Sequence, residues 1–153
     1  MLSHENQGVV TWGVELDEDR GRVLVGGDLE EGVGTRVFAP DIETYVGSRR
    51  WDRSCLQEPL LQAQADRVQP DDLTALRESW SEGAVTFGWP GVENHRFEQG
   101  QVKLMLWSST GQTDWFISGP VDELKVILST LRSLSNLKEA LWSADTAGES
   151  LLG

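Results

Sequence analysis

The sequence predicts an α+β domain in which an antiparallel sheet, made of an N-terminal hairpin and a C-terminal meander, packs with helices. Three observations predict it. Runs rich in Val and Trp near the N-terminus and again after residue 92 are separated by charged or glycine-containing turns. Apolar residues recur at helical spacing between these two regions and after the second. The 153 residues suffice to bury the core of one domain.

The N-terminal region is expected to form three short strands. Residues 8–16 alternate loosely between apolar and polar, which is typical of a half-buried strand. A charged turn at residues 17–21 leads to a second strand at residues 23–25, and the two predict a hairpin. Residues 35–38 add a third strand after an acidic loop.

Three helices are expected next. The first follows Asp41 and ends near Gly47, and the third runs over residues 70–80, where two Asp residues lie near the positive end of its dipole. The second is predicted over residues 54–67. Its apolar side would carry Leu56, Leu60, Leu61 and Ala65.

The second half of the chain is expected to form a meander followed by helices. The meander strands are predicted at residues 83–89, 92–98, 101–107 and 113–118. A helix then begins at Pro120, with Leu124, Leu128 and Leu131 on its buried stripe, and a shorter helix covers residues 136–142. Residues 143–153 are mostly small and polar. They predict a flexible tail after a single domain over residues 1–142.

The strong negative charge indicates which partners to expect. The chain has 25 acidic and 13 basic residues, which gives a net charge of −12. Direct contact with nucleic acid or with an anionic membrane surface needs clustered Lys and Arg, so neither is expected. A basic protein is the favoured partner, because opposite charges speed encounter.

The composition also predicts a cytoplasmic protein. Its sequence has no apolar run of about 18 residues, the length of a membrane span, and no secretory signal pattern. A single cysteine, Cys55, excludes an internal disulfide and is typical of a reducing compartment.

Signatures of catalysis are mostly absent from the sequence. It contains no nucleophile elbow and no phosphate-binding loop. His4 and His95 do not have the spacing of zinc ligands, and Cys55 is expected to be a small buried residue at a helix start rather than a nucleophile. We therefore expect a protein that is not an enzyme and that uses no cofactor and no metal.

Two acidic loops are the predicted binding region. Residues 15–31 hold seven acidic and two basic residues. Tryptophan is enriched in binding hot spots, so Trp51 is predicted as an exposed aromatic anchor in addition to these loops. The predicted partner-binding residues are Asp17, Glu18, Asp19, Asp28, Glu30, Glu31 and Trp51.

Two stretches carry a family resemblance. Residues 5–14 read Glu-Asn-Gln-Gly-Val-Val-Thr-Trp-Gly-Val, and residues 92–118 include Leu-Met-Leu-Trp at 104–107 and Trp-Phe-Ile at 115–117. Both resemble stretches of the SUKH superfamily, bacterial immunity proteins related to fungal regulators of cell-wall synthesis. The resemblance extends over roughly two thirds of the chain. The helical part that precedes residue 5 in that family is not seen here.

The resemblance implies a SUKH-like fold and an immunity function. Such a protein acts as an antitoxin in the bacterial cytoplasm, where it binds a cognate toxin and blocks its active site. In this family an acidic surface commonly covers the basic cleft of a nuclease toxin. Without the usual N-terminal part, the sheet would leave an apolar face open, which we expect a homodimer or the helices of residues 42–80 to cover.

Two other functions remain open from the sequence. The chain could be a regulatory or scaffold module that binds a host protein, as other members of the superfamily do. Its seven tryptophans also allow a small-ligand-binding domain, or a minor hydrolase, with a tryptophan-lined pocket.

Overall fold

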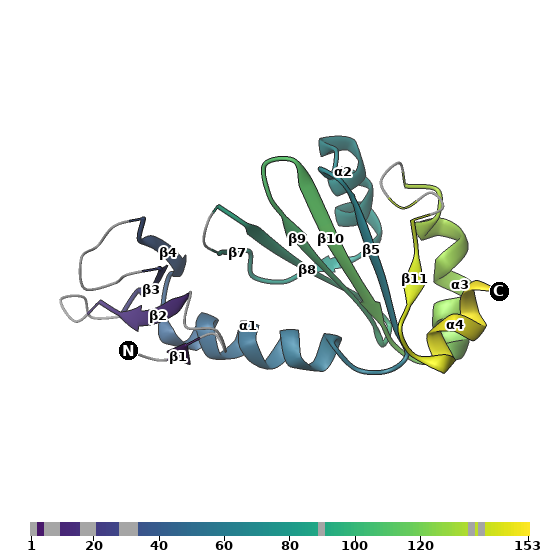
Figure 1. The fold of residues 1–153 in the computed structure, drawn as a ribbon, viewed down its shortest axis with the longest axis horizontal. Coiled ribbons are helices and arrows are strands. Elements are labelled where there is room, and N and C mark those ends of the chain that lie inside the picture. The colour runs from purple at the N-terminus through teal and green to yellow at the C-terminus, as the bar shows by residue number, and fades with distance from the viewer. Residues whose placement is uncertain are drawn as a thin grey trace.

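The computed structural model describes residues 3–4, 10–15, 21–27, 34–88, 91–134, 137 and 140–153. Within these residues it has four helices and eleven strands, and the strands form two antiparallel sheets (Figure 1). The class predicted from the sequence, α+β with antiparallel strands and packed helices, is confirmed. The N-terminal hairpin and the C-terminal meander, however, lie in two separate sheets instead of one.

The smaller sheet has four strands that pair in chain order. They are β1 (Ser3–His4), β2 (Thr11–Val14), β3 (Val23–Gly26) and β4 (Arg36–Ala39). The predicted hairpin is formed by β2 and β3, with Val14 opposite Val23. Val25 and Phe38 pack with Tyr45 of the first helix in a small core of their own.

The larger sheet has seven strands in the order β11-β5-β10-β9-β8-β6, and β7 also pairs with β8. They are β5 (Leu60–Asp66), β6 (Ser81–Glu82), β7 (Thr86–Phe87), β8 (Glu93–Gln99), β9 (Val102–Ser108), β10 (Gln112–Ser118) and β11 (Trp142–Ser143). The strands predicted at residues 92–98, 101–107 and 113–118 are β8, β9 and β10, joined in sequence as expected.

The predicted strand at residues 83–89 is wrong as one element. Of the described residues in this range, only Thr86 and Phe87 form a strand, β7, and the two-residue strand β6 ends just before it at Glu82. Between the two strands, the carbonyl oxygen of Ala84 accepts a hydrogen bond from the guanidinium of Arg96 at 3.0 Å, and the hydroxyl of Thr86, the first residue of β7, accepts another. Because these groups of the segment form hydrogen bonds with a buried arginine, the segment does not pair with β8 as one continuous strand.

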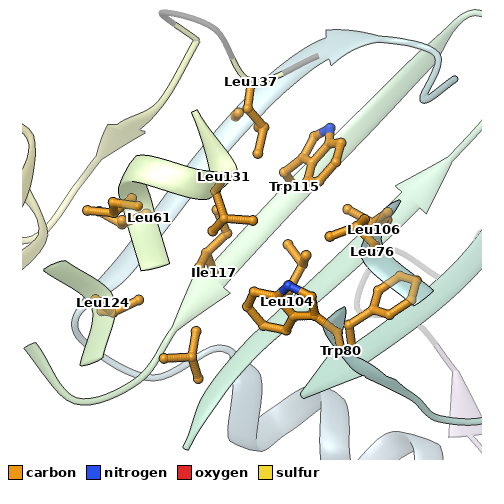
Figure 2. Close-up of a cluster of buried hydrophobic side chains, with 14 of the residues drawn as sticks. Leu61, Leu76, Trp80, Leu104, Leu106, Trp115, Ile117, Leu124, Leu131 and Leu137 are labelled. Carbon is orange, nitrogen blue, oxygen red and sulfur yellow. The ribbon is translucent and has the colours of Figure 1, made fainter. Parts of the chain in front are cut away.

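The main core lies on one face of the larger sheet, beneath α2 (Pro70–Ser79) and α3 (Val121–Leu131). Both helices begin near their predicted positions. Every second strand residue points to this face, so Leu104, Leu106 and Trp115 are fully buried. Figure 2 shows these side chains together with Leu124 and other apolar residues of the core. One face of the larger sheet is therefore apolar, and the opposite face also carries polar side chains such as Gln62 and Gln64.

Helix α1 (Ile42–Cys55) joins the two sheets, and Figure 1 shows it running from the smaller sheet to the larger one. Asp41 caps its N-terminus by accepting a hydrogen bond from the Thr44 N–H at 2.7 Å. The predicted end at Gly47 is wrong, because Gly47 lies on the exposed side of a helix whose buried residues keep helical spacing over all 14 residues. These buried residues are Tyr45, Ser48, Asp52 and Cys55.

The helix predicted over residues 54–67 is also wrong. Its first two residues end α1, and Leu60–Asp66 is strand β5 between β10 and β11. Leu61 and Ala63 point into the core, whereas Gln62 and Gln64 point to the other face. The apolar residues of this stretch fit the spacing of a helix and also that of a strand. The stretch forms a strand because it pairs with all seven residues of β10.

The C-terminal residues do not form the predicted flexible tail. They form β11 and helix α4 (Thr146–Leu152). Asp145 caps α4 through Gly148 N–H at 2.7 Å and accepts a second hydrogen bond from Leu60 N–H at 2.9 Å. The helix predicted at residues 136–142 falls partly outside the described residues. Of the rest, Ala140 lies in a turn and Trp142 begins β11.

Gly148→Ala is expected to destabilise the protein by about 1–3 kcal/mol, because an added methyl group overpacks this junction. The new Cβ would clash with Ser143 Oγ, which donates a hydrogen bond to Leu60 O. Gly47→Ala is the matched control, since nothing lies within 4 Å of a Cβ there. It is expected to stabilise α1 by about 0.5–1 kcal/mol. Urea unfolding measures both variants, and equal effects would contradict the packing of α4.

Stability is expected to depend on pH through Asp145. Hydrogen bonds from the main-chain N–H groups of Leu60 and Gly148 lower the pKa of Asp145 below its ordinary 3.8. The stabilisation is therefore complete above pH 3.8 and is lost as the pH falls through the lowered pKa. The difference in unfolding free energy between the wild type and Asp145→Asn should shrink below that pH. Urea unfolding across the acid range measures it, and a constant difference would disprove the effect.

Candidate functional site

Six of the seven residues predicted to bind a partner lie outside the described residues. They are Asp17, Glu18, Asp19, Asp28, Glu30 and Glu31. The seventh, Trp51, is half-buried on α1. Its indole N–H donates a hydrogen bond to Glu98, and the Lys103 ammonium lies 5.7 Å from the centre of its ring. Trp51 is thus engaged within the molecule and helps to hold α1 against β8 and β9.

Cys55 has the environment of a structural residue. Cys55 is buried as predicted, but it ends α1 instead of lying at a helix start, because the residues after it form strand β5. Its Sγ donates to the carbonyl oxygen of Phe116 at 3.7 Å. Burial raises the pKa of the Cys55 thiol to about 12. The thiol therefore stays protonated at neutral pH, whereas a nucleophilic cysteine needs the thiolate.

His95 is buried between two carboxylates. Its Nδ1 lies 3.2 Å from Glu82 Oε1 and its Nε2 lies 3.6 Å from Glu93 Oε2. A hydrogen bond from Arg77 lowers the pKa of Glu82, so this neighbour of the imidazole is charged at neutral pH. The ring also stacks on Phe97. These contacts fix the imidazole in place at the sheet edge.

Arg96 and Asp52 form a buried clamp between β8 and α1. The guanidinium donates two hydrogen bonds to the carboxylate, Nε to Oδ1 at 2.7 Å and Nη2 to Oδ2 at 3.0 Å. Its remaining nitrogen, Nη1, donates to Ala84 O and to Thr86 Oγ1. Every nitrogen of the guanidinium is thus used inside the protein, and the pair serves to position α1.

The face of the larger sheet opposite the main core is divided into a covered part and an exposed part. Arg96, Met105 and Phe116 lie opposite one another across β8, β9 and β10 and point to this face. Helix α1 packs over the first two, which are buried. Beyond Phe116 the same row continues over Gln62 to Trp142, which is 49% exposed.

We name this exposed part the open sheet face. It consists of Gln62, Gln64, Trp107, Asp114, Phe116 and Trp142. Trp107 is 38% exposed, and its ring contacts that of Phe116, with 4.9 Å between the centroids. In register, Trp107, Asp114 and Gln64 form a second row beside the first. Exposed tryptophans beside amides and a carboxylate are the composition of a binding surface.

A hollow of about 280 Å³ opens in the open sheet face over β5 and β10. Its floor is the main chain of Ala63 and Trp115, which lie opposite each other and send their side chains into the core. Its walls are Gln62, Gln64, Asp114, Phe116 and Trp142. The hollow thus joins aromatic, amide and carboxylate groups in one place.

Sequence reasoning did not find the open sheet face. The helix predicted over residues 54–67 and the helix predicted over residues 136–142 separated Gln62 and Gln64 from Trp142 and from the meander. The signal that could have found it is the alternation of Leu61, Gln62, Ala63 and Gln64, which has the period of a strand.

Neither a metal-binding cluster nor a membrane-spanning helix is found in the described part of the chain. No group of three or more His, Cys, Asp or Glu side chains there could hold a metal ion. Among the described helices, none has the length and apolar character needed to cross a membrane. In comparisons with known proteins, no family model, curated protein or solved structure matches this chain.

Proposed function

We propose that this chain is a non-catalytic protein-binding module, an immunity protein of the SUKH kind that neutralises a basic bacterial toxin by direct binding. The net charge of −12 favours a basic partner. The sequence resemblance supplies the toxin as the kind of partner. Binding stoichiometrically, the protein would keep substrate away from the toxin's active site.

The open sheet face is the observation that carries the binding function. Trp107 and Trp142 are both more than one third exposed, although burial of a tryptophan is strongly favourable. An aromatic surface of this kind, framed by polar side chains, is typical of protein interaction sites, where Trp dominates the binding energy. The face also lies on a rigid sheet, which limits the entropy lost on binding.

The environments of Cys55 and His95 favour binding over catalysis. The thiol of Cys55 is buried and protonated at neutral pH, and the imidazole of His95 is buried between carboxylates. Neither side chain lines the hollow. Cys55 and His95 are therefore engaged in the structure of the protein, away from the hollow.

The acidic loop residues keep a role in this proposal. Asp17, Glu18, Asp19, Asp28, Glu30 and Glu31 would attract the basic partner from a distance and raise the rate of association. Trp107 and Trp142 would then set the lifetime of the complex, because buried aromatic anchors act mainly on dissociation.

The test compares the wild type with the double variant Trp107→Ala/Trp142→Ala. Tagged protein is used to purify partners from cells that carry the gene, and the partner is then tested for toxicity and for inhibition by each variant. We expect one basic toxin in equimolar amount and a loss of affinity of about 30-fold or more in the double variant. Val126→Ala is the control, because Val126 is 74% exposed on α3, away from the open sheet face.

Other outcomes would overturn the proposal. A host regulatory or cell-wall protein as the equimolar partner would replace immunity by the scaffold function. If the wild type and the double variant bind the toxin with equal affinity, the open sheet face is not part of the interface. If neither the wild type nor the double variant recovers a partner protein, and a small molecule binds in the hollow, the results would favour a small-ligand-binding function.

A further inference from the structure

The hollow in the open sheet face contains the carboxylate of Asp114, which no described Lys or Arg neutralises. Asp114 accepts hydrogen bonds from Gln112 Nε2 at 2.9 Å and from Gln64 Nε2 at 3.3 Å, and both reach Oδ1. Among the described residues, Asp114 forms no ion pair and its Oδ2 accepts no hydrogen bond. The two amides hold the carboxylate in place, and one oxygen remains free toward a ligand.

Two aromatic side chains flank Gln62 on the open sheet face. Phe116 and Trp142 lie on either side of Gln62 in one row, so their strands are two spacings apart, roughly 10 Å. A flat group that enters between them can stack on an aromatic face while it reaches the neighbouring row, where Asp114 lies. Stacking on a ring strongly favours a cation, because the ring face is electron-rich.

The side chain that meets all these conditions is arginine. Its guanidinium is planar, stacks on aromatic rings and donates two parallel hydrogen bonds to a carboxylate. The amide oxygens of Gln62 and Gln64 can accept from its remaining N–H groups. The lysine ammonium is a compact and strongly hydrated charge that does not stack in this way.

We propose that the hollow binds the guanidinium of an arginine side chain from the partner protein, paired with Asp114 and stacked against Trp142. The inference rests on the proposed function in taking the partner to be a basic protein. It adds the residue type that the partner presents at the centre of the interface. Arginine is itself enriched in binding hot spots, which agrees with this position.

The experiment uses the intact chain and a small probe, the amide of N-acetyl-arginine. Binding is followed by NMR through the indole N–H signals of Trp107 and Trp142 and the side-chain amides of Gln62 and Gln64. We expect these signals to shift, with the arginine probe binding about fivefold to tenfold more tightly than its uncharged isostere, the amide of N-acetyl-citrulline. The lysine analogue should bind more weakly than the arginine probe.

Variants localise the binding site. Asp114→Asn is expected to weaken the arginine probe about tenfold, and Trp142→Ala about fivefold. Asp122→Asn removes one exposed carboxylate from the first turn of α3 and should leave binding unchanged. Equal binding of the arginine and citrulline probes, an unchanged affinity in Asp114→Asn, or a response only to neutral sugars would each overturn the inference.

Failure of this inference can be told from failure of the proposed function. The arginine probe can fail to bind while the double variant Trp107→Ala/Trp142→Ala still loses its affinity for the toxin. In that case the immunity function stands and the arginine site is disproved. If the probe binds as expected but no toxin is recovered, the site stands as a guanidinium-binding hollow and the immunity function falls.

Discussion

Asp52→Ala is expected to lower the free energy of unfolding by about 3–5 kcal/mol. Asp52 accepts two hydrogen bonds from Arg96, whose side chain is 2% exposed. A guanidinium keeps its charge under all ordinary conditions, so the variant leaves an unpaired charge buried between α1 and β8. Urea unfolding followed by tryptophan fluorescence measures the loss.

Two controls separate the buried charge from other effects of the Asp52 substitution. Asp52→Leu combined with Arg96→Met removes both charges, and it should recover much of the lost stability because no charge is left unpaired. Arg77→Ala breaks the exposed pair with Glu82 and should cost less than about 1 kcal/mol. If Arg77→Ala lowered the free energy of unfolding as much as Asp52→Ala, the buried clamp would contribute no more to stability than an exposed ion pair.

Trp115→Ala is expected to destabilise the protein by about 3–5 kcal/mol, because it opens a large cavity in the main core. The Trp115 side chain is fully buried, and it lies in β10 at the centre of the larger sheet. The loss combines the apolar surface of the indole with contacts to the core residues that surround it. The midpoint of urea unfolding measures it.

Trp107→Ala is the matched comparison for Trp115→Ala. Trp107 lies on the neighbouring strand β9 but points to the open sheet face and is 38% exposed. Its replacement should cost no more than about 1.5 kcal/mol, since much of the ring is in water already. A cost equal to that of Trp115→Ala would mean that the open sheet face is part of the core and not a binding surface.

The sequence predicted three of the four meander strands correctly, because the information that specifies these three is local. The strands β8, β9 and β10 follow one another through short turns, and Leu104 and Leu106 alternate with residues that point to the opposite face of the sheet. The sequence predicts a helix where strand β5 forms, because the pairing partner of β5, strand β10, lies far along the chain. Gln and Ala are good helix formers, and only the distant pairing overrides that preference.

The candidate site was harder to predict than the fold. It gathers Gln62, Asp114 and Trp142 from three separate strands, and no short motif marks their proximity. The predicted anchor Trp51 faces β8 and β9 instead, where it contacts Glu98 through a hydrogen bond and Lys103 through its ring. Similarly, the clamp joins Asp52 and Arg96 across 44 positions of sequence, and a buried pair of this kind leaves no periodic pattern.

Helix α1 makes the two cores depend on each other. It is 14 residues long, and an isolated helix of that length is only marginally stable in water. Tyr45 anchors one end in the small core, and Asp52 and Cys55 anchor the other end against the larger sheet. Each sheet therefore supports a helix that the other also needs. Melting of either core withdraws support from the second, so the two halves unfold as one cooperative unit.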